Sequence, residues 1–402
     1  MSNSSKAIAP EGRTVTEAIT APRIFDGDSW LFEYALLIED GQILDVLPTA
    51  NVPPGVALLD LEDGILAPGF IDLQVNGGGG VMFNSQPEYA GLQTMLAAHR
   101  GFGTTAIMPT LISDQPEIYQ RGIAAVREAR DQGNPSILGL HIEGPFFEPT
   151  RRGAHRQSCL RDLTEEDIGW LCAAADLPLM LTLAPERCQP GQISQLAQAG
   201  ILVCAGHTSA SFEQARAALQ EGLRGFTHLY NAMGPVTARE PGVVGAALDD
   251  VHSWAGIIAD GHHVHPASLL LAHRAKARGK LCLVTDAMAT VGTSENSFQL
   301  YDETITLRDG KLVNAEGKLA GSAIGMIQAV RVAHEAAGIE LGECLNMASR
   351  YPAAFLRRDD ERGCLAPGYR VDLTHFDDDY RVHNTWIAGD RTRHDPARLA
   401  GT

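Results

Sequence analysis

The pattern of hydrophobic and polar positions divides the chain into three parts. Residues 1–66 carry short runs of strand composition, separated by turn signals such as Asp40-Gly41; these runs are 15–19, 31–38 and 42–47. Similar runs return near the C-terminal end, at 369–376 and 383–387. Because neither end is long enough to make a core alone, we predict that residues 1–66 and 364–402 form one small β-sandwich domain together.

Between the two ends, strand-like and helix-like stretches alternate. Eight apolar runs predict strands at 71–75, 104–109, 137–142, 179–184, 201–205, 225–229, 254–259 and 280–285. Amphipathic stretches predict helices at 88–101, 115–132, 164–175, 192–199, 211–221 and 266–278. Eight strand and crossover units within residues 67–363 predict a closed (β/α)8 barrel. A doubly wound open sheet is the alternative, although no G-x-G-x-x-G follows the first strand.

An irregular stretch, 288–320, follows the last predicted strand. It contains a hairpin signal at Arg308-Asp309-Gly310-Lys311, and helices are expected after it at 323–337 and 341–355. We interpret the stretch as an insertion over the active-site end of the barrel, with an edge structure as the alternative.

Composition and charge limit the possible partners. The chain has 402 residues, of which 45% are hydrophobic and 20% charged, and its formal net charge is -17. Such a surface repels nucleic acid and anionic membranes, so an anionic ligand needs a local cluster of donors. The first fifteen residues lack the apolar core of a signal peptide, no run reaches membrane-spanning length, and the seven cysteines include no C-x-x-C pair. We expect a cytoplasmic protein without a disulfide framework.

Polar side chains gather at the C-terminal ends of the predicted strands, which meet at one mouth of a barrel. In chain order they are Gln74, Asn76, Glu143, His207, His228, Asn231, Asp260, His262, His263 and Asp286. Taken singly, Glu143 is most simply a solvated loop carboxylate, and each histidine is most simply a hydrogen-bonded loop or core residue. Taken together, Glu143, His207 and His228 indicate a divalent metal site.

One carboxylate and two imidazoles leave a coordination position for water, as in catalytic rather than structural zinc sites. A metal lowers the pKa of bound water toward about 7, which supplies a hydroxide nucleophile at neutral pH. Asp286 follows a strongly apolar run and is placed to accept the proton of the water and return it to a leaving amine. Its simpler interpretation is a turn or N-cap aspartate.

Two features could bind a phosphate. The glycine run 77–80 could offer backbone N–H groups to an anion, although such a run is equally a flexible loop. Arg239 is the better candidate because a guanidinium binds phosphate through two hydrogen bonds, whereas its simpler interpretation is a surface pair with Glu240.

Six motifs stand out along the chain: Ala67-Pro68-Gly69-Phe70-Ile71-Asp72, His141-Ile142-Glu143-Gly144-Pro145, Gly206-His207-Thr208, Thr227-His228-Leu229-Tyr230-Asn231-Ala232-Met233, Ala259-Asp260-Gly261 and Val284-Thr285-Asp286-Ala287. They resemble those of the N-acetylglucosamine-6-phosphate deacetylase family of the amidohydrolase superfamily. The resemblance covers about residues 66–366, in the order the family has them.

The resemblance implies a role for each site residue. Glu143, His207 and His228 would bind the metal, Asp286 would be the general base and acid, and His155 would polarise the acetamide carbonyl. The substrate-binding residues implied are Gln74, Asn231, Ala232, Arg239 and His263. Asn231, the backbone of Ala232 and Arg239 would hold the phosphate, with Arg239 reaching into the site of a neighbouring subunit, so a homodimer is expected.

Binuclear relatives carry H-x-H at the end of the first strand. Here that position is Gln74-Val75-Asn76, and an amide is a poor zinc ligand. We therefore expect one divalent metal ion per subunit, Zn²⁺ in the first instance. The implied reaction is hydrolysis of N-acetyl-D-glucosamine 6-phosphate to glucosamine 6-phosphate and acetate. The alternatives are an N-acetylgalactosamine-6-phosphate deacetylase, another amidohydrolase such as a cyclic-amide hydrolase, or a non-catalytic scaffold on the same barrel.

Overall fold

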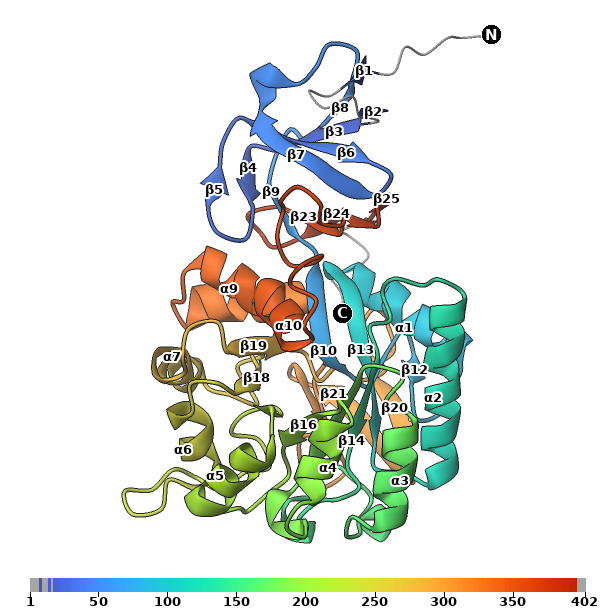
Figure 1. Ribbon diagram of the computed structural model, residues 1–402, viewed down its shortest axis with the longest axis vertical. Helices are drawn as coiled ribbons and strands as arrows, with labels where there is room; N and C mark the ends of the chain where they lie inside the picture. The colour runs from blue at the N-terminus through green and yellow to red at the C-terminus, as the bar shows by residue number, and fades with distance from the viewer. Residues whose placement is uncertain (1–6, 9–13, 16, 396–402) are drawn as a thin grey trace.

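A computed structural model describes residues 7–8, 14–15 and 17–395. A β unit lies at one end of a larger β/α body, and the chain passes from one to the other through β9 (Ile65–Pro68) and β10 (Phe70–Val75) (Figure 1). Part of the strand predicted at 15–19 and the outer parts of the predicted terminal segments, 1–6, 9–13, 16 and 396–402, lie outside the described residues.

The larger body is the predicted (β/α)8 barrel. In the described part of the chain its eight parallel strands follow the sequence order β10, β13 (Thr104–Ile112), β14 (Leu140–Glu143), β15 (Leu179–Leu183), β16 (Leu202–Ala205), β17 (Gly225–Phe226), β18 (Trp254–Ile258) and β19 (Leu281–Val284). The first and last strands also meet. Val75 pairs in parallel with Ala287, and the N–H of Asp286 donates to the carbonyl of Gln74 at 3.0 Å, so the barrel is closed.

Most of the helices around the barrel have one apolar face, and side-chain N-caps start some of them. Capping boxes start α3 at Thr164 and α5 at Ser211. The helices around the barrel are α1 (Tyr89–Arg100), α2 (Pro116–Asp131), α3 (Glu165–Ala173), α4 (Gln192–Gln198), α5 (Phe212–Glu221), α6 (Gly242–Asp249), α7 (Pro266–Ala275), α8 (Met326–Arg331), α9 (Leu341–Ala348) and α10 (Arg350–Phe355). A π-helical turn, Val332–Ala336, continues α8. Helix α6 is an element that the sequence analysis missed.

The β unit combines both ends of the chain, as predicted. One sheet has the order β25 (Asp390–Arg393), β24 (Val382–Ile387), β23 (Leu373–Phe376), β9, β4 (Arg23–Phe25) and β5 (Trp30–Leu31). The other has the order β7 (Gln42–Pro48), β6 (Tyr34–Glu39), β3 (Glu17–Thr20) and β8 (Ala57–Asp60). Buried side chains from both sheets, among them Ile19, Leu36 and Trp386, share one apolar cluster. The division of the chain at residues 66 and 364 stays a prediction.

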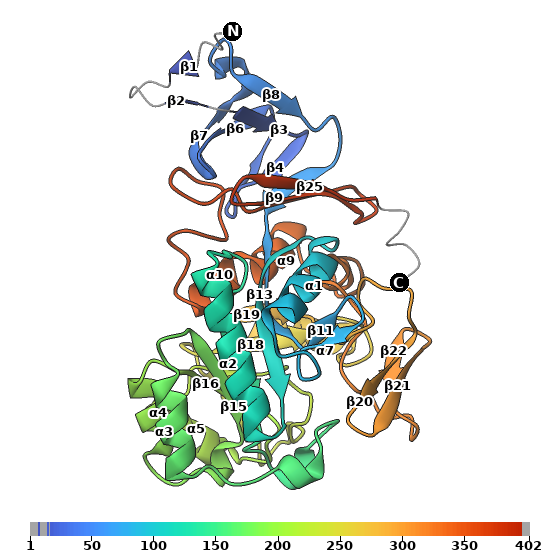
Figure 2. The ribbon, with the colours of Figure 1, turned by 90° about the vertical axis from the view of Figure 1, so that its right-hand side faces the viewer.

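The insertion after β19 forms a small antiparallel sheet on the side of the barrel (Figure 2). Its strands are β20 (Ser297–Leu300), β21 (Glu303–Arg308) and β22 (Lys311–Val313), and the predicted hairpin joins the last two. Leu300, Ile305 and Leu312 from this sheet pack against Ile112 and Met288, which lie where β13 and β19 leave the barrel. The insertion therefore packs beside the C-terminal ends of β13 and β19, at the edge of the predicted site.

Candidate metal centre and reaction cavity

The predicted site residues sit at or just beyond the C-terminal ends of the strands. Glu143 is the last residue of β14, and His207, His228 and Asp286 each lie two residues beyond the end of their strands. These last three residues have positive φ angles of 50°, 32° and 52°. An L-residue rarely adopts this region, and strained backbone of this kind persists where the surrounding structure imposes it. The left-handed turn directs the chain away from the strand while the side chain stays at the barrel mouth.

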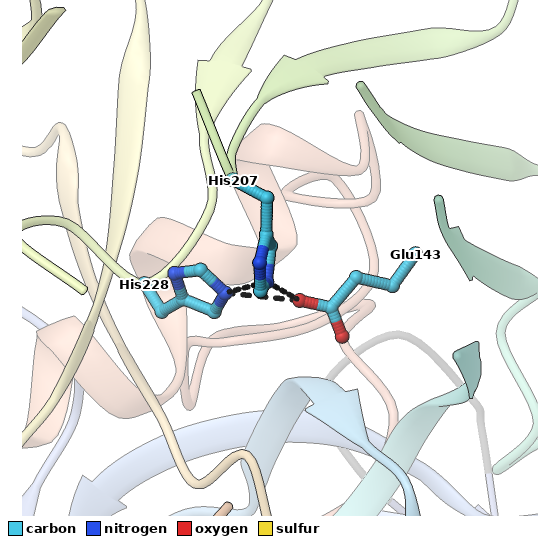
Figure 3. Close-up of side chains that lie close together, drawn as sticks. All are labelled: Glu143, His207 and His228. Atoms are coloured by element: carbon cyan, nitrogen blue, oxygen red, sulfur yellow. Dashed lines mark hydrogen bonds and ion pairs between the residues drawn. The ribbon is translucent and has the colours of Figure 1, made fainter. Parts of the chain in front are cut away.

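Glu143, His207 and His228 converge on one point (Figure 3). Oε1 of Glu143 lies 3.3 Å from Nε2 of His207 and 2.9 Å from Nε2 of His228, and the two Nε2 atoms are 3.0 Å apart. The three side chains are at most 5% exposed. A carboxylate and two imidazoles with their ligand atoms directed at one another form a donor set that suits a divalent cation.

The hydrogen bonds around His207 also fit a metal ligand. Nδ1 of His207 lies 2.8 Å from the backbone carbonyl of Arg151, to which it can only donate. The Nε2 atom of the neutral ring therefore carries the lone pair that faces Glu143 and His228. A second nitrogen that is tied to a carbonyl in this way is the usual support of a metal-ligating histidine.

The pKa values of two buried carboxyl groups, Glu143 and Asp286, are shifted in opposite directions by their surroundings. Burial alone would raise the pKa of Glu143, but the close contacts with the imidazoles of His207 and His228 outweigh it and hold that pKa well below its usual range. Burial, and then the negative charge of Glu143, raise the pKa of Asp286 to about 6. One carboxylate is thus a permanent anion, while the other can exchange a proton near neutral pH.

A cavity of about 190 Å³ opens beside these groups. It is lined by Ile112, Glu143, Gly153, Ala154, His155, His207, His228, Asn231, Ala232, His263, Asp286, Met288, Leu319 and Gly321. The lining includes the predicted metal ligands, the predicted acid-base group and four further predicted residues, His155, His263, Asn231 and Ala232. Leu319 and Gly321 come from the end of the insertion, which therefore forms part of the cavity wall.

Two histidines of the lining are held in fixed orientations. Nδ1 of His263 lies 2.6 Å from Oδ2 of Asp260, so Asp260 orients the ring. The ring of His155 packs edge-on against Phe147 and His207, with centroid distances of 4.9 and 4.6 Å. Burial, followed by the nearby His207, holds the pKa of His155 well below its usual range, so this imidazole is neutral.

Gln74 lies behind the cavity rather than in its wall. It is 1% exposed, and its Nε2 donates to Oε1 of Glu143 and to Oδ1 of Asp286, each at 3.1 Å. Asn76 donates to the same Oδ1 of Asp286 at 2.6 Å. The geometry therefore favours a positioning role for Gln74 over the substrate contact expected from the resemblance.

The glycine run 77–80 and Arg239 were the two candidates for binding a phosphate. The glycine run is not an anion cradle, because the N–H groups of Gly77, Gly79 and Gly80 donate to backbone carbonyls at 3.0, 2.8 and 2.9 Å. Arg239 is exposed and does not line the cavity, and among the described residues it has no ion-pair partner. The surface pair with Glu240 does not form, since Oε1 of Glu240 accepts from the backbone of Phe212 and Gly242.

Sequence reasoning missed two polar groups that hold the site together. Asp72 is fully buried beneath the mouth and accepts from the N–H and the hydroxyl of Thr285, which ties β10 to the end of β19. Ser113, directly after β13, contacts Nδ1 of His155 through both its N–H and its hydroxyl. The six-residue motif that ends in Asp72 was a signal for the first group. A single serine after a strand gave none for the second.

A closed (β/α)8 barrel with this donor set at its strand ends defines a metal-dependent hydrolase. Two family models match the chain: the amidohydrolase family over residues 65–392 and the NagA composite domain over residues 18–66. The chain belongs to the amidohydrolase family, which uses a divalent metal.

Known relatives and solved structures agree with this assignment. The chain is 45% identical to an N-acetylgalactosamine-6-phosphate deacetylase of Shewanella sp. (strain ANA-3), over 82% of this chain and 84% of that protein. It is 36% identical to an N-acetylglucosamine-6-phosphate deacetylase of Haemophilus influenzae, over 89% of this chain and 94% of that protein. The crystal structure of N-acetylglucosamine-6-phosphate deacetylase from Pasteurella multocida superposes with a TM-score of 0.91 at 36% identity, covering 94% of this chain and 100% of that one.

Replacing Glu143 by Gln should release the metal. The substitution keeps the size of the side chain and removes its charge. Loss of a residue that only supports a metal ligand already costs up to roughly 100-fold in metal affinity, so loss of the ligand charge should cost at least that much. Metal content after desalting, measured by mass spectrometry, is the readout. Glu148→Gln, just outside the cavity lining, is the control and should keep its metal. Full metal content in Glu143→Gln would contradict the assignment.

Proposed function

We propose that this protein hydrolyses N-acetyl-D-glucosamine 6-phosphate to D-glucosamine 6-phosphate and acetate. The observation that carries the proposal is the shared cavity: the metal-ligating set, a carboxyl group with a raised pKa and a neutral imidazole all line one volume of about 190 Å³. A metal site, an acid-base group and a hydrogen-bond donor are the groups that metal-assisted hydrolysis of an amide requires. The deacetylases named among the relatives act on phosphorylated N-acetyl amino sugars, which selects the substrate class.

In the proposed mechanism Glu143, His207 and His228 hold the divalent ion, which supplies Lewis acidity and lowers the pKa of water when bound. Asp286 accepts a proton from the attacking water. His155 donates a hydrogen bond to the acetamide oxygen and so stabilises negative charge as it develops there. Asp286 then transfers its proton to the amine nitrogen as the carbon–nitrogen bond breaks, and the sugar amine and acetate are released.

Substrate recognition is proposed to use the opposite side of the cavity. His263, Asn231 and the backbone of Ala232 line that side. Arg239 lies outside the cavity of its own subunit, so we propose that it contacts the phosphate in the site of a second subunit, which makes the protein a homodimer. Support comes from the exposed loop around Arg239, where Val236 is 53% exposed. A single guanidinium can supply the bidentate contact that an acidic protein otherwise lacks.

We further propose that the metal is Zn²⁺, one ion per subunit, and that the protein works in the cytoplasm. Two imidazoles and a carboxylate with room for water suit catalytic zinc, and the amides Gln74 and Asn76 occupy the positions where a second ion would need imidazoles. None of the described helices is long and apolar enough to cross a membrane. All seven cysteines are unpaired, in keeping with a reducing compartment.

The second candidate substrate is N-acetyl-D-galactosamine 6-phosphate. It is favoured by the 45% identity to the Shewanella protein, which exceeds the 36% identity to the Haemophilus protein. The two sugars are epimers with the same amide and phosphate, so the proposed mechanism serves both.

The test of the function is kcat/KM for the two phosphorylated sugars and for unphosphorylated N-acetylglucosamine. We expect turnover of both phosphorylated sugars, with the gluco epimer preferred, and a much lower value without the phosphate. A preference for the galacto epimer would establish the second candidate. Absence of acetate release from every N-acetyl sugar in metal-loaded enzyme would refute the deacetylase assignment.

Asp286→Asn should keep metal and substrate binding but lose most turnover. General acid-base groups contribute roughly 100-fold to 10,000-fold, so kcat should fall by that amount. The matched control is Asp260→Asn, whose side chain contacts His263 and the backbone of His262, and which should change KM more than kcat. Near-wild-type kcat in Asp286→Asn would remove it as the acid-base group.

The same residue sets the acid limb of the pH profile. A general base works when ionised, and burial with the charge of Glu143 raises the pKa of Asp286 to about 6. As pH falls through this value, Asp286 is protonated and kcat/KM decreases. A bound cation can only lower the pKa, so we expect an apparent value at or below about 6. The limb should be absent from the residual activity of Asp286→Asn.

Arg239→Ala should raise KM for the phosphorylated sugar by roughly 10-fold to 100-fold, because a hydrogen bond to a charged group is worth about 1.5–3 kcal/mol. KM for the unphosphorylated sugar should stay unchanged. Arg216→Ala, an exposed arginine paired with Asp249, is the control. Equal effects on both sugars would contradict the phosphate contact.

Mixing subunits tests whether Arg239 crosses the interface. Neither Arg239→Ala nor Asp286→Asn homodimers should turn over the phosphorylated sugar well at low concentration. In a mixed dimer one site combines an intact Asp286 with the partner's intact Arg239, so activity should be restored. No restoration after demonstrated subunit exchange would place Arg239 outside the shared site.

A further inference from the structure

Ser113 lies where the second strand of the barrel reaches the reaction cavity. It directly follows β13 and is fully buried, as is almost all of His155. Its backbone N–H donates to Nδ1 of His155 at 3.1 Å, and its hydroxyl oxygen lies 2.8 Å from the same nitrogen. Two groups of one residue thus converge on a single ring atom of the histidine that is proposed to contact the acetamide.

This pair of contacts decides which ring nitrogen of His155 carries the proton. A backbone N–H has only a hydrogen to offer, so Nδ1 must accept and cannot itself be protonated in the neutral ring. The proton therefore sits on Nε2. Among the described residues, Nε2 of His155 has no hydrogen-bond partner, and the side chain lines the cavity. The atom that remains for the substrate is a hydrogen-bond donor.

A residue of the insertion holds the backbone carbonyl of Ser113 through a hydrogen bond. The hydroxyl of Tyr301, next to the end of β20, donates to the carbonyl of Ser113 at 2.5 Å. The guanidinium carbon of Arg156 lies over the Tyr301 ring, 4.9 Å from the ring centroid. Gly144 leaves space for the side chain of Ser113, since a Cβ at Gly144 would lie 2.4 Å from Oγ of Ser113. The serine is therefore held by a hydrogen bond from the insertion and packs closely against Gly144.

We propose that Ser113 is a positioning residue that locks His155 in the tautomer with the proton on Nε2, with Tyr301 holding the Ser113 peptide from the insertion. In this tautomer His155 donates to the acetamide oxygen. In the other tautomer the lone pair of Nε2 would face that oxygen and repel it as negative charge grows. The inference deepens the proposed function and rests on it for the identity of the acceptor, whereas the tautomer itself does not depend on any substrate.

The tautomer is measured first, on metal-loaded enzyme labelled with ¹⁵N-histidine. Long-range proton–nitrogen correlations distinguish the two nitrogens, and His155→Gln identifies the signals. We expect His155 to be neutral with the proton on Nε2. A proton on Nδ1 would overturn the proposal. If the tautomer is as expected and no N-acetyl sugar is hydrolysed, the proposed function fails while the hold of Ser113 on His155 stands.

The catalytic consequence is measured with Ser113→Ala, which removes the hydroxyl and keeps the backbone N–H. One hydrogen bond worth about 1–1.5 kcal/mol corresponds to a roughly 10-fold loss in kcat, with KM and metal content nearly unchanged. Tyr301→Phe should lower kcat to a smaller extent. The control is Thr104→Val, which removes a buried hydroxyl from the same strand that has no hydrogen-bond partner in the described structure. It should leave kcat unchanged.

A double-mutant cycle separates positioning from a general structural role. If Ser113 acts through His155, Ser113→Ala should cause no further loss of kcat in a His155→Ala background. A serine that only stabilises the fold would cost the same factor in both backgrounds. Equal losses, or a loss confined to KM, would overturn the proposal.

Discussion

The carboxylate of Glu143 is the constraint on which the rest of the site depends. A buried charge is tolerated only when it is paired and hydrogen-bonded, and Glu143 is 2% exposed at the end of an apolar strand. Its partners are two imidazoles from other strands and the amide of Gln74. None of these neighbours is close in sequence, so the carboxylate is compensated only when the barrel closes and brings four strands to one mouth.

Barrel closure also imposes the backbone that the site requires. His207, His228 and Asp286 have positive φ angles, each at a cost on the order of 1–3 kcal/mol for a residue with a side chain. The contacts that oppose this cost join the first and last strands: the bond from the N–H of Asp286 to Gln74, and the bonds from Thr285 to Asp72. The residues of the site and the residues that close the barrel are neighbours in sequence. The stability of the barrel and the geometry of its mouth therefore depend on the same contacts.

The sequence was sufficient for the barrel and insufficient for part of the site. Buried parallel strands appear as apolar runs, so all eight were predictable, but Gly242–Asp249 has almost no polar face and gave no helical period. The proposed metal ligands were visible because histidine and carboxylate at strand ends are costly without a partner. Gly77–Gly80 misled because composition does not show that backbone N–H groups are already bonded, and Ser113 was invisible because one serine after a strand is ordinary.

The amides at Gln74 and Asn76 fit the proposal that the site holds one ion. At these positions a binuclear site would place a second cation beside Asp286, and a nearby positive charge lowers the pKa of a carboxyl group. Here both amides donate to Oδ1 of Asp286, which orients the carboxyl without adding charge. Before any cation binds, burial and the charge of Glu143 raise the pKa of Asp286 to about 6. Amides in place of imidazoles thus fit the proposed role of Asp286, which has to accept a proton and return it.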